Sequence, residues 1–189
     1  MVESDAETSY KKLCEGNTRF IEGKHLTRDH VIRRRELTSM QQPYVGIITC
    51  SDSRVAPEHL FDAGLGELFV IRNAGNVVDV NALASLEYAV QHLGVKFIVV
   101  LGHEMCGAIN AACTFDNHLG NLGKLMEDLG ESVRRGGFDP SRAVVENVLL
   151  SIEKIQTGSE HLKDLIDGGG LTVKGALYSL DTGVVRWLE

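Results

Sequence analysis

The segment 44–101 decides the fold, because three short apolar runs alternate there with helical patterns: YVGIITC at 44–50, LFVI at 68–71 and FIVVL at 97–101. Each run has the length of a buried strand. Pro57 opens a short helix between the first two runs. Between the second and third, apolar residues recur at helical spacing over residues 81–93, and Gly94 ends that helix. This strand–helix–strand–helix–strand series predicts a parallel sheet with right-handed crossovers.

The flanking segments add helices and two further strands. Residues 1–40 read as two helices, the first ended by Gly23 and the second running from about 27 to 40. Helices continue to about Asp167, and strands follow at 171–180 and 184–188. No repeat or linker divides the chain. We therefore predict a single α/β domain over 1–189, with a mostly parallel central sheet flanked by helices and an N-terminal helical arm.

Composition excludes several classes of protein. The 189 residues are 43% hydrophobic and 24% charged, which is typical of a globular domain. The net charge of -7 argues against a broad nucleic-acid-binding surface. No apolar run approaches the roughly 18 residues that cross a bilayer, and the acidic N-terminus lacks the pattern of a targeting signal. We expect a cytoplasmic protein that binds neither nucleic acid nor membranes.

Two polar clusters directly follow predicted strands: CSDSR at 50–54 and HEMC at 103–106. Ligands bind at the carboxyl ends of strands in an open parallel sheet, so the clusters meet if their strands are neighbours. Two thiolates and one imidazole suit Zn²⁺, and three protein ligands leave a fourth position for water or substrate. The sequence therefore predicts a catalytic site in which Cys50, His103 and Cys106 hold one zinc ion per chain.

The residues alone leave other assignments open. His59, Cys113 or Asp52 could supply a fourth ligand. Alternatively, Cys50 and Cys106 could be buried apolar residues, with His103 a hydrogen-bonded loop residue, and Asp52 and Arg54 a structural salt bridge. Cys14 and Cys113 are expected to be small core residues, because a reducing compartment argues against disulfides.

The segment NAGN at 73–76 is predicted to be a structural turn beside the active site. It lacks the glycine-rich pattern of a phosphate loop or a dinucleotide-binding fingerprint. Nucleotide binding is therefore not expected at this turn.

Five segments together closely resemble the β-class carbonic anhydrases over nearly the whole chain: ITCSDSRV at 48–55, GELFVIRNAGN at 66–76, EYAV at 87–90, GHEMCGA at 102–108 and GALYSLDTG at 175–183. The resemblance implies a zinc lyase that reversibly hydrates carbon dioxide to bicarbonate and a proton. It also implies a homodimer or a dimer of dimers, in which the helices of residues 1–40 pack on the dimer partner.

The resemblance assigns roles residue by residue. Cys50, His103 and Cys106 match the zinc ligands. Asp52 and Arg54 match a pair that orients the zinc-activated water attacking carbon dioxide and gates the zinc, with Asp52 as fourth ligand in a closed state. The residues that match substrate-binding positions, partly from the neighbouring subunit, are Gln41, Phe69, Tyr88 and Gly107. His92 matches a possible proton shuttle.

Two positions depart from family patterns. Glu104 stands where a small residue usually follows the histidine ligand. Ile47 stands where one subgroup has a tryptophan of an inhibitory bicarbonate site, although Arg72 matches the arginine of that site. The resemblance therefore implies a plant-like substrate pocket rather than the bicarbonate-inhibited type.

Two other functions stay open from the sequence. One is a related hydrolase of carbonyl sulfide or carbon disulfide, and the other is a non-catalytic zinc-binding relative. The intact ligand set with Asp52 and Arg54 argues against the second. Because two thiolates offset part of the zinc charge, we expect activity to favour mildly alkaline buffer.

Overall fold

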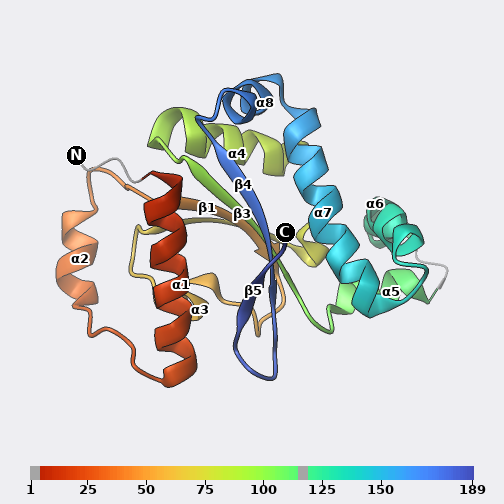
Figure 1. Ribbon diagram of the computed structural model, residues 1–189, viewed down its shortest axis with the longest axis horizontal. Coiled ribbons are helices and arrows are strands. Elements are labelled where there is room, and N and C mark those ends of the chain that lie inside the picture. The colour runs from red at the N-terminus through yellow and green to blue at the C-terminus, as the bar shows by residue number, and fades with distance from the viewer. Residues whose placement is uncertain (1–4, 115–118) are drawn as a thin grey trace.

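A computed structural model describes residues 5–114 and 119–189 of the chain. Its centre is a five-stranded sheet in the order β2-β1-β3-β4-β5 (Figure 1). The strands are β1 (Val45–Cys50), β2 (Leu68–Asn73), β3 (Phe97–His103), β4 (Thr172–Tyr178) and β5 (Val185–Trp187). The first four run parallel, and β5 is antiparallel to β4. The prediction of a mostly parallel central sheet flanked by helices is confirmed.

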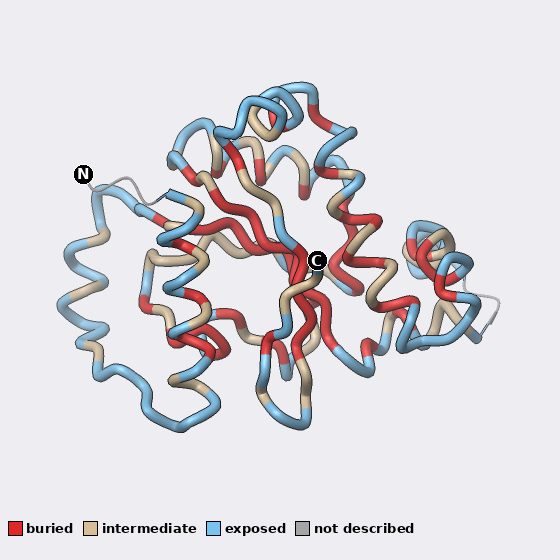
Figure 2. The backbone as a smooth tube through the Cα atoms, viewed as in Figure 1, coloured by how far each residue is buried: buried red, intermediate tan, exposed pale blue. Residues whose placement is uncertain are grey.

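Helices cover both faces of the sheet, which is why the central strands are apolar throughout. All residues of β3 are buried. Phe97, Val99 and Leu101 pack in a cluster with α1 (Ala6–Glu22) and α3 (Pro57–Leu60). Ile98 and Val100 point the other way, into a cluster with α4 (Val80–Leu93), α7 (Pro140–Gly158) and α8 (Glu160–Asp167). Figure 2 shows buried residues concentrated along these strands.

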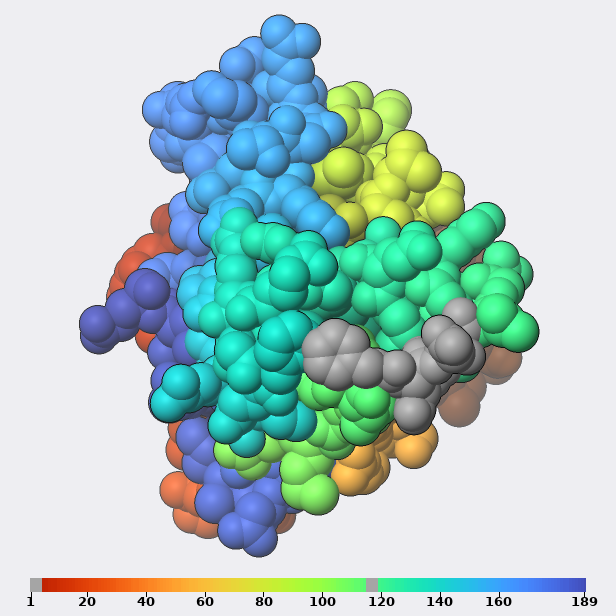
Figure 3. All heavy atoms as spheres, turned by 90° about the vertical axis from the view of Figure 1, so that its right-hand side faces the viewer, coloured from red at the N-terminus to blue at the C-terminus, as the bar shows by residue number. Residues whose placement is uncertain are grey.

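The other helices of the described segments are α2 (His30–Glu36), α5 (Gly107–Cys113) and α6 (Gly120–Arg135), together with the 3-10 turn η1 (Ala74–Asn76). A third apolar cluster joins α5, α6 and α7 beside the sheet. In the view of Figure 3, α6 lies at the centre of this side of the molecule. Within the described ranges, no helix is long and apolar enough to cross a membrane.

The N-terminal arm behaves as two different parts. Helix α1 packs on its own chain: Leu13 is fully buried, and buried Asn17 bonds to the carbonyl oxygens of Leu60 and Gly183 and to the amide of Val185. Helix α2 is shorter than the predicted segment 27–40 and has no buried residue. Packing of this arm on a dimer partner stays a prediction.

Candidate metal centre

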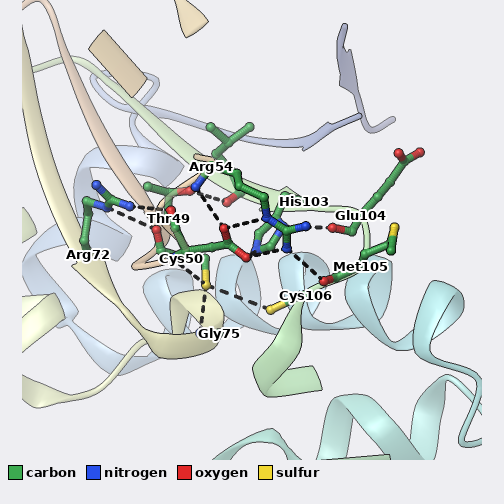
Figure 4. A network of polar contacts seen from close by, with 11 residues as sticks. Thr49, Cys50, Arg54, Arg72, Gly75, His103, Glu104, Met105 and Cys106 are labelled. Atoms are coloured by element: carbon green, nitrogen blue, oxygen red, sulfur yellow. Dashed lines mark hydrogen bonds and ion pairs between the residues drawn. The ribbon is translucent and has the colours of Figure 1, made fainter. Parts of the chain in front are cut away.

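The site lies where the central strands end. Strands β1 and β3 are parallel neighbours, with Thr49 opposite Leu101. Cys50 is the last residue of β1 and His103 the last of β3, so both side chains leave the sheet at its carboxyl edge. Cys106 follows as the N-cap residue of α5. The prediction that the two polar clusters meet at one edge is confirmed (Figure 4).

A tight loop brings the second cysteine beside the histidine. Met105 has a φ of 53°, in the left-handed region that a side chain adopts only at a cost of about 1 kcal/mol or more. The amide of Glu104 donates to the carbonyl oxygen of Tyr178 at 3.0 Å and anchors the start of this loop to β4. The chain therefore turns within the two residues, Glu104 and Met105, that separate His103 from Cys106.

The three side chains fit a zinc ion. Their ligand atoms lie within 4.8 Å of one another, and the sulfur atoms of Cys50 and Cys106 are 3.9 Å apart. Two sulfurs at Zn–S bond lengths in a tetrahedral site are about 3.8 Å apart. Within the described parts of the chain, His59 and Cys113 belong to no such group, so neither is placed to be the fourth ligand.

The imidazole of His103 is oriented for metal binding. The ring is fully buried, and its Nδ1 hydrogen-bonds to the carbonyl oxygen of Glu104 at 2.9 Å. Nδ1 is therefore the protonated nitrogen, which leaves the lone pair of Nε2 for a metal. Among the residues that the structure describes, Nε2 is buried and has no hydrogen-bond partner. A buried polar atom of this kind is costly unless something binds it, which argues against a purely structural histidine.

The pKa values of the two thiols also favour a bound cation at this site. Hydrogen bonding from Cys106 lowers the pKa of Cys50 to about 4, with further help from His103 and two backbone amides against the opposing effect of burial. The hydrogen bond to Cys50 and burial raise the pKa of Cys106. The pair thus shares one proton and one negative charge. An added positive charge, such as a divalent cation, would favour the thiolate form of both.

Asp52 and Arg54 form an ion pair at the rim of the centre. Hydrogen bonds from the Arg54 side chain hold the pKa of Asp52 well below its ordinary value of 3.8. Oδ2 of Asp52 lies 4.0 Å from Nε2 of His103, too far for a hydrogen bond but next to the metal position. Arg54 also reaches the carbonyl oxygen of Met105, at 3.5 Å. The predicted pair is therefore both a salt bridge and a neighbour of the site.

Arg72 has a role at this site that the sequence did not reveal. From β2, its Nε donates to the carbonyl oxygen of Cys50 at 3.1 Å, and its Nη2 donates to that of Asp52 at 2.7 Å. These bonds fix the turn that carries a ligand and the rim carboxylate. In the sequence, Arg72 matches the arginine of a bicarbonate site and lies near the end of a strand beside β1, and neither signal identifies its carbonyl acceptors.

The turn predicted at 73–76 lies beside the metal centre. Gly75 has a φ of 72°, which glycine adopts freely, and its amide donates to the sulfur of Cys50 at 3.4 Å. The amide of Asp52 donates to the same sulfur, also at 3.4 Å. The thiolate therefore receives two backbone hydrogen bonds (Figure 4 shows that from Gly75).

The remaining predicted residues do not meet the metal centre within one chain, apart from Gly107, which begins α5 next to Cys106. Gln41 is exposed. Phe69 pairs with Gly46, four residues before Cys50, which places it about 13 Å back along the sheet. Tyr88 lies 6.2 Å from Phe69 and 5.0 Å from His92 between ring centroids. We call Phe69, Tyr88 and His92 the aromatic strip.

Fold and site define an α/β protein with a Cys-His-Cys group that could hold a metal ion at the carboxyl edge of a mostly parallel sheet. The family model described as carbonic anhydrase matches residues 45–185. The chain belongs to the β-class carbonic anhydrase family.

Individual relatives agree with this assignment. Carbonic anhydrase 2 of Mycobacterium tuberculosis is 39% identical, over 97% of this chain and 93% of that protein. The Coccomyxa β-carbonic anhydrase solved with acetazolamide has a TM-score of 0.73 at 28% identity, covering 96% of this chain and 82% of that one. A tetrameric β-carbonic anhydrase of Sordaria macrospora has a TM-score of 0.71 at 30% identity, covering 82% and 85%.

Proposed function

We propose that this protein catalyses the reversible hydration of carbon dioxide to bicarbonate and a proton, with one zinc ion held by Cys50, His103 and Cys106. The observation that carries the proposal is the convergence of these three side chains around the buried Nε2 of His103, which has no hydrogen-bond partner in the described part of the chain. Membership of the carbonic anhydrase family supports the choice of reaction. When bound, zinc lowers the pKa of a water ligand and so supplies a nucleophile near neutral pH.

The chain's own contribution is to orient that nucleophile. Asp52 is ionised, so it can accept a hydrogen bond from a water at the centre and leave an oxygen lone pair facing carbon dioxide. Arg54 holds both oxygens of Asp52, which fixes the direction of the acceptor. Oδ2 of Asp52 already lies 4.0 Å from Nε2 of His103, so on leaving this fork the carboxylate would be able to move in as the fourth ligand. The pair would thereby gate the centre.

The proposed substrate pocket needs a second copy of the chain. Tyr88 is 47% exposed and the aromatic strip lies far from its own metal centre. We place Gln41, Phe69 and Tyr88 at the site of a dimer partner, with Gly107 at its own site and His92 as a candidate proton shuttle. The tetrameric relative from Sordaria macrospora supports an assembly of several copies of the chain. A cytoplasmic location fits the four cysteines, all of which are free thiols.

Stopped-flow measurement of carbon dioxide hydration in mildly alkaline buffer tests the reaction, with zinc content assayed on the same sample. We expect fast hydration that disappears on chelation and returns when zinc is added back. A fully zinc-loaded protein with no hydration would reject the proposal, and carbonyl sulfide and carbon disulfide would then be tried as substrates.

Mixed assemblies test the shared pocket. One chain would carry Tyr88→Ala and the other Cys106→Ser. The first homodimer then lacks Tyr88, the second lacks an intact metal centre, and only the mixed dimer contains both. If Tyr88 serves the partner's site, the intact centre in the mixed dimer faces wild-type Tyr88 from the Cys106→Ser chain. Activity above that of either homodimer is then expected. Activity no higher than that of the Tyr88→Ala homodimer would contradict the sharing.

A further inference from the structure

Asn147 is a buried amide on α7, a helix that contributes no metal ligand. Its side chain is held in the interior, with only 4% of the residue exposed. Its Nδ2 donates to the carbonyl oxygen of Gly75 at 2.7 Å, the shortest bond that links α7 to the turn η1. Gly75 in turn donates its own amide to the sulfur of Cys50. One residue of the turn therefore connects α7 to a metal ligand.

The turn needs this support because its conformation is unusual. Gly75 and Asn76 both have left-handed φ values, of 72° and 44°. Asn73 closes the turn from within, since its side chain bonds to both the amide and the carbonyl oxygen of Val77. Leu129 of α6 and Ala108 of α5 crowd the position that a Cβ on Gly75 would take, at 3.1 to 3.3 Å. Gly75 is thus wedged between two helices.

Two side chains of α7 donate hydrogen bonds to carbonyl oxygens of this turn. Asn147 donates to that of Gly75, and Ser151, one helical turn later, donates to that of Asn76 at 3.3 Å. The two bonds look alike, but only Gly75 is also bonded to Cys50. This difference separates a bond that acts on the metal centre from one that only holds the turn.

We propose that Asn147 is a positioning residue for the metal centre, which fixes Gly75 so that its amide points at the thiolate of Cys50. The inference rests on the proposed zinc site. Removing the Asn147 amide leaves the carbonyl of Gly75 buried and unpaired, so the turn must shift to satisfy it. The amide of Gly75 then moves away from the sulfur. The thiolate loses one of its two backbone donors and becomes a more electron-rich ligand.

The test compares Asn147→Leu with Ser151→Ala in the full-length protein loaded with Co²⁺ in place of zinc. Hydrogen bonds to a thiolate stabilise its lone pairs, so losing one shifts the sulfur-to-cobalt charge-transfer band to longer wavelength. We expect that shift in Asn147→Leu, together with zinc affinity about tenfold weaker by chelator competition, because the loss of the fixed orientation around Cys50 outweighs the stronger donation by its sulfur. Ser151→Ala should match the wild type in both readouts, even if both variants lose thermal stability.

A folded Asn147→Leu protein with an unshifted band and wild-type zinc affinity would overturn the inference. An equal shift in Ser151→Ala would overturn it too, because general loosening of the turn would then explain the result. A wild-type protein that binds neither zinc nor Co²⁺ would reject the proposed zinc site itself. If the wild type binds metal and hydrates carbon dioxide normally, but Asn147→Leu changes neither the band nor the zinc affinity, only the positioning role is rejected.

A measurement on the wild-type protein covers the case in which Asn147→Leu does not fold. The ¹⁵N-labelled protein is loaded with ¹¹³Cd, and scalar coupling between the metal and the Gly75 amide proton is sought. Such coupling passes through an N–H···S hydrogen bond only when the amide points at a metal-bound sulfur. Coupling at Gly75 is expected, and its absence in the loaded protein would overturn the inference.

Discussion

The guanidinium of Arg54 holds both carboxylate oxygens of Asp52, with Nε 2.9 Å from Oδ1 and Nη2 2.7 Å from Oδ2. The backbone amide of Arg54 adds a third bond, to Oδ1, at 2.9 Å. A parallel fork of this kind fixes direction as well as charge. It keeps an ionised acceptor beside the metal position without making it a permanent ligand.

Asp52→Ala should lower carbon dioxide hydration by about 10²-fold while zinc content stays at one per chain, because the variant removes the orienting acceptor but none of the three ligands. Turnover and zinc are measured on the same sample. Asp164→Ala, at an exposed position on α8, is the matched control and should change neither quantity. Loss of zinc from Asp52→Ala would instead make Asp52 a permanent fourth ligand.

Removing zinc should lower the stability of the fold. Zinc at a free concentration of 100 times its Kd adds about 2.7 kcal/mol to the free energy of unfolding, so chelation should lower Tm reversibly. Cys106→Ser should abolish this response. Cys113→Ser and His59→Gln should retain it, because neither residue belongs to the group around His103. Thermal unfolding with and without chelator measures each response, and a variant of His59 that lost zinc would contradict the ligand set.

Asp62→Asn should destabilise the protein by about 3 kcal/mol at neutral pH, because it breaks a buried ion network. The Asp62 side chain is 3% exposed and bonds to Arg28 at 2.6 Å and Arg19 at 2.5 Å, which ties the α1–α2 connection to α3. Its φ of 42° is well tolerated by asparagine, so the change isolates the charge. Urea unfolding at fixed zinc concentration measures the effect.

The same variant should alter the pH dependence of stability. Burial alone would raise the pKa of Asp62, but hydrogen bonds from Arg28 and Arg19 outweigh it and hold the pKa well below 3.8. A carboxylate whose pKa is depressed in the folded protein stabilises the fold at pH values above its pKa in the unfolded chain, and this stabilisation is lost as pH falls below about 4. The difference in free energy of unfolding between wild type and Asp62→Asn should therefore be largest near neutral pH and become smaller below about pH 4. Asp167→Asn, which breaks an exposed pair with Lys163, should show neither effect.

Gly16→Ala should cost about 3 kcal/mol or more, because the new Cβ would lie 1.9 Å from the carbonyl oxygen of Phe61. Backbone cannot swing aside as a flexible side chain can, so α1 would have to move and expose Leu13. Gly130→Ala on α6 is the control. Its Cβ meets only the end of Arg134, at 3.3 Å, and removing a mid-helix glycine should stabilise by about 0.5–1 kcal/mol. Equal effects at the two glycines would contradict the packing of α1.

Local patterns account for most of the fold that the sequence predicts. The apolar runs became β1, β2 and β3, and Gly23 and Gly94 end their helices in left-handed conformations. Predicted boundaries were less accurate where packing decides them. Helix α2 stops at Glu36 rather than near Met40, because it has no buried face to extend its periodicity.

The sequence by itself determined which residues could form a zinc centre. Cys50, His103 and Cys106 are zinc-binding residue types that stand at or just after the ends of apolar strands, and both features can be recognised from short stretches of sequence. The tertiary structure decided what surrounds them. Arg72 and Asn147 act through backbone carbonyls of distant residues, and a carbonyl acceptor leaves no mark in the sequence. The 3.9 Å between the two sulfurs likewise follows from strand order and the turn at Met105, which only folding brings together.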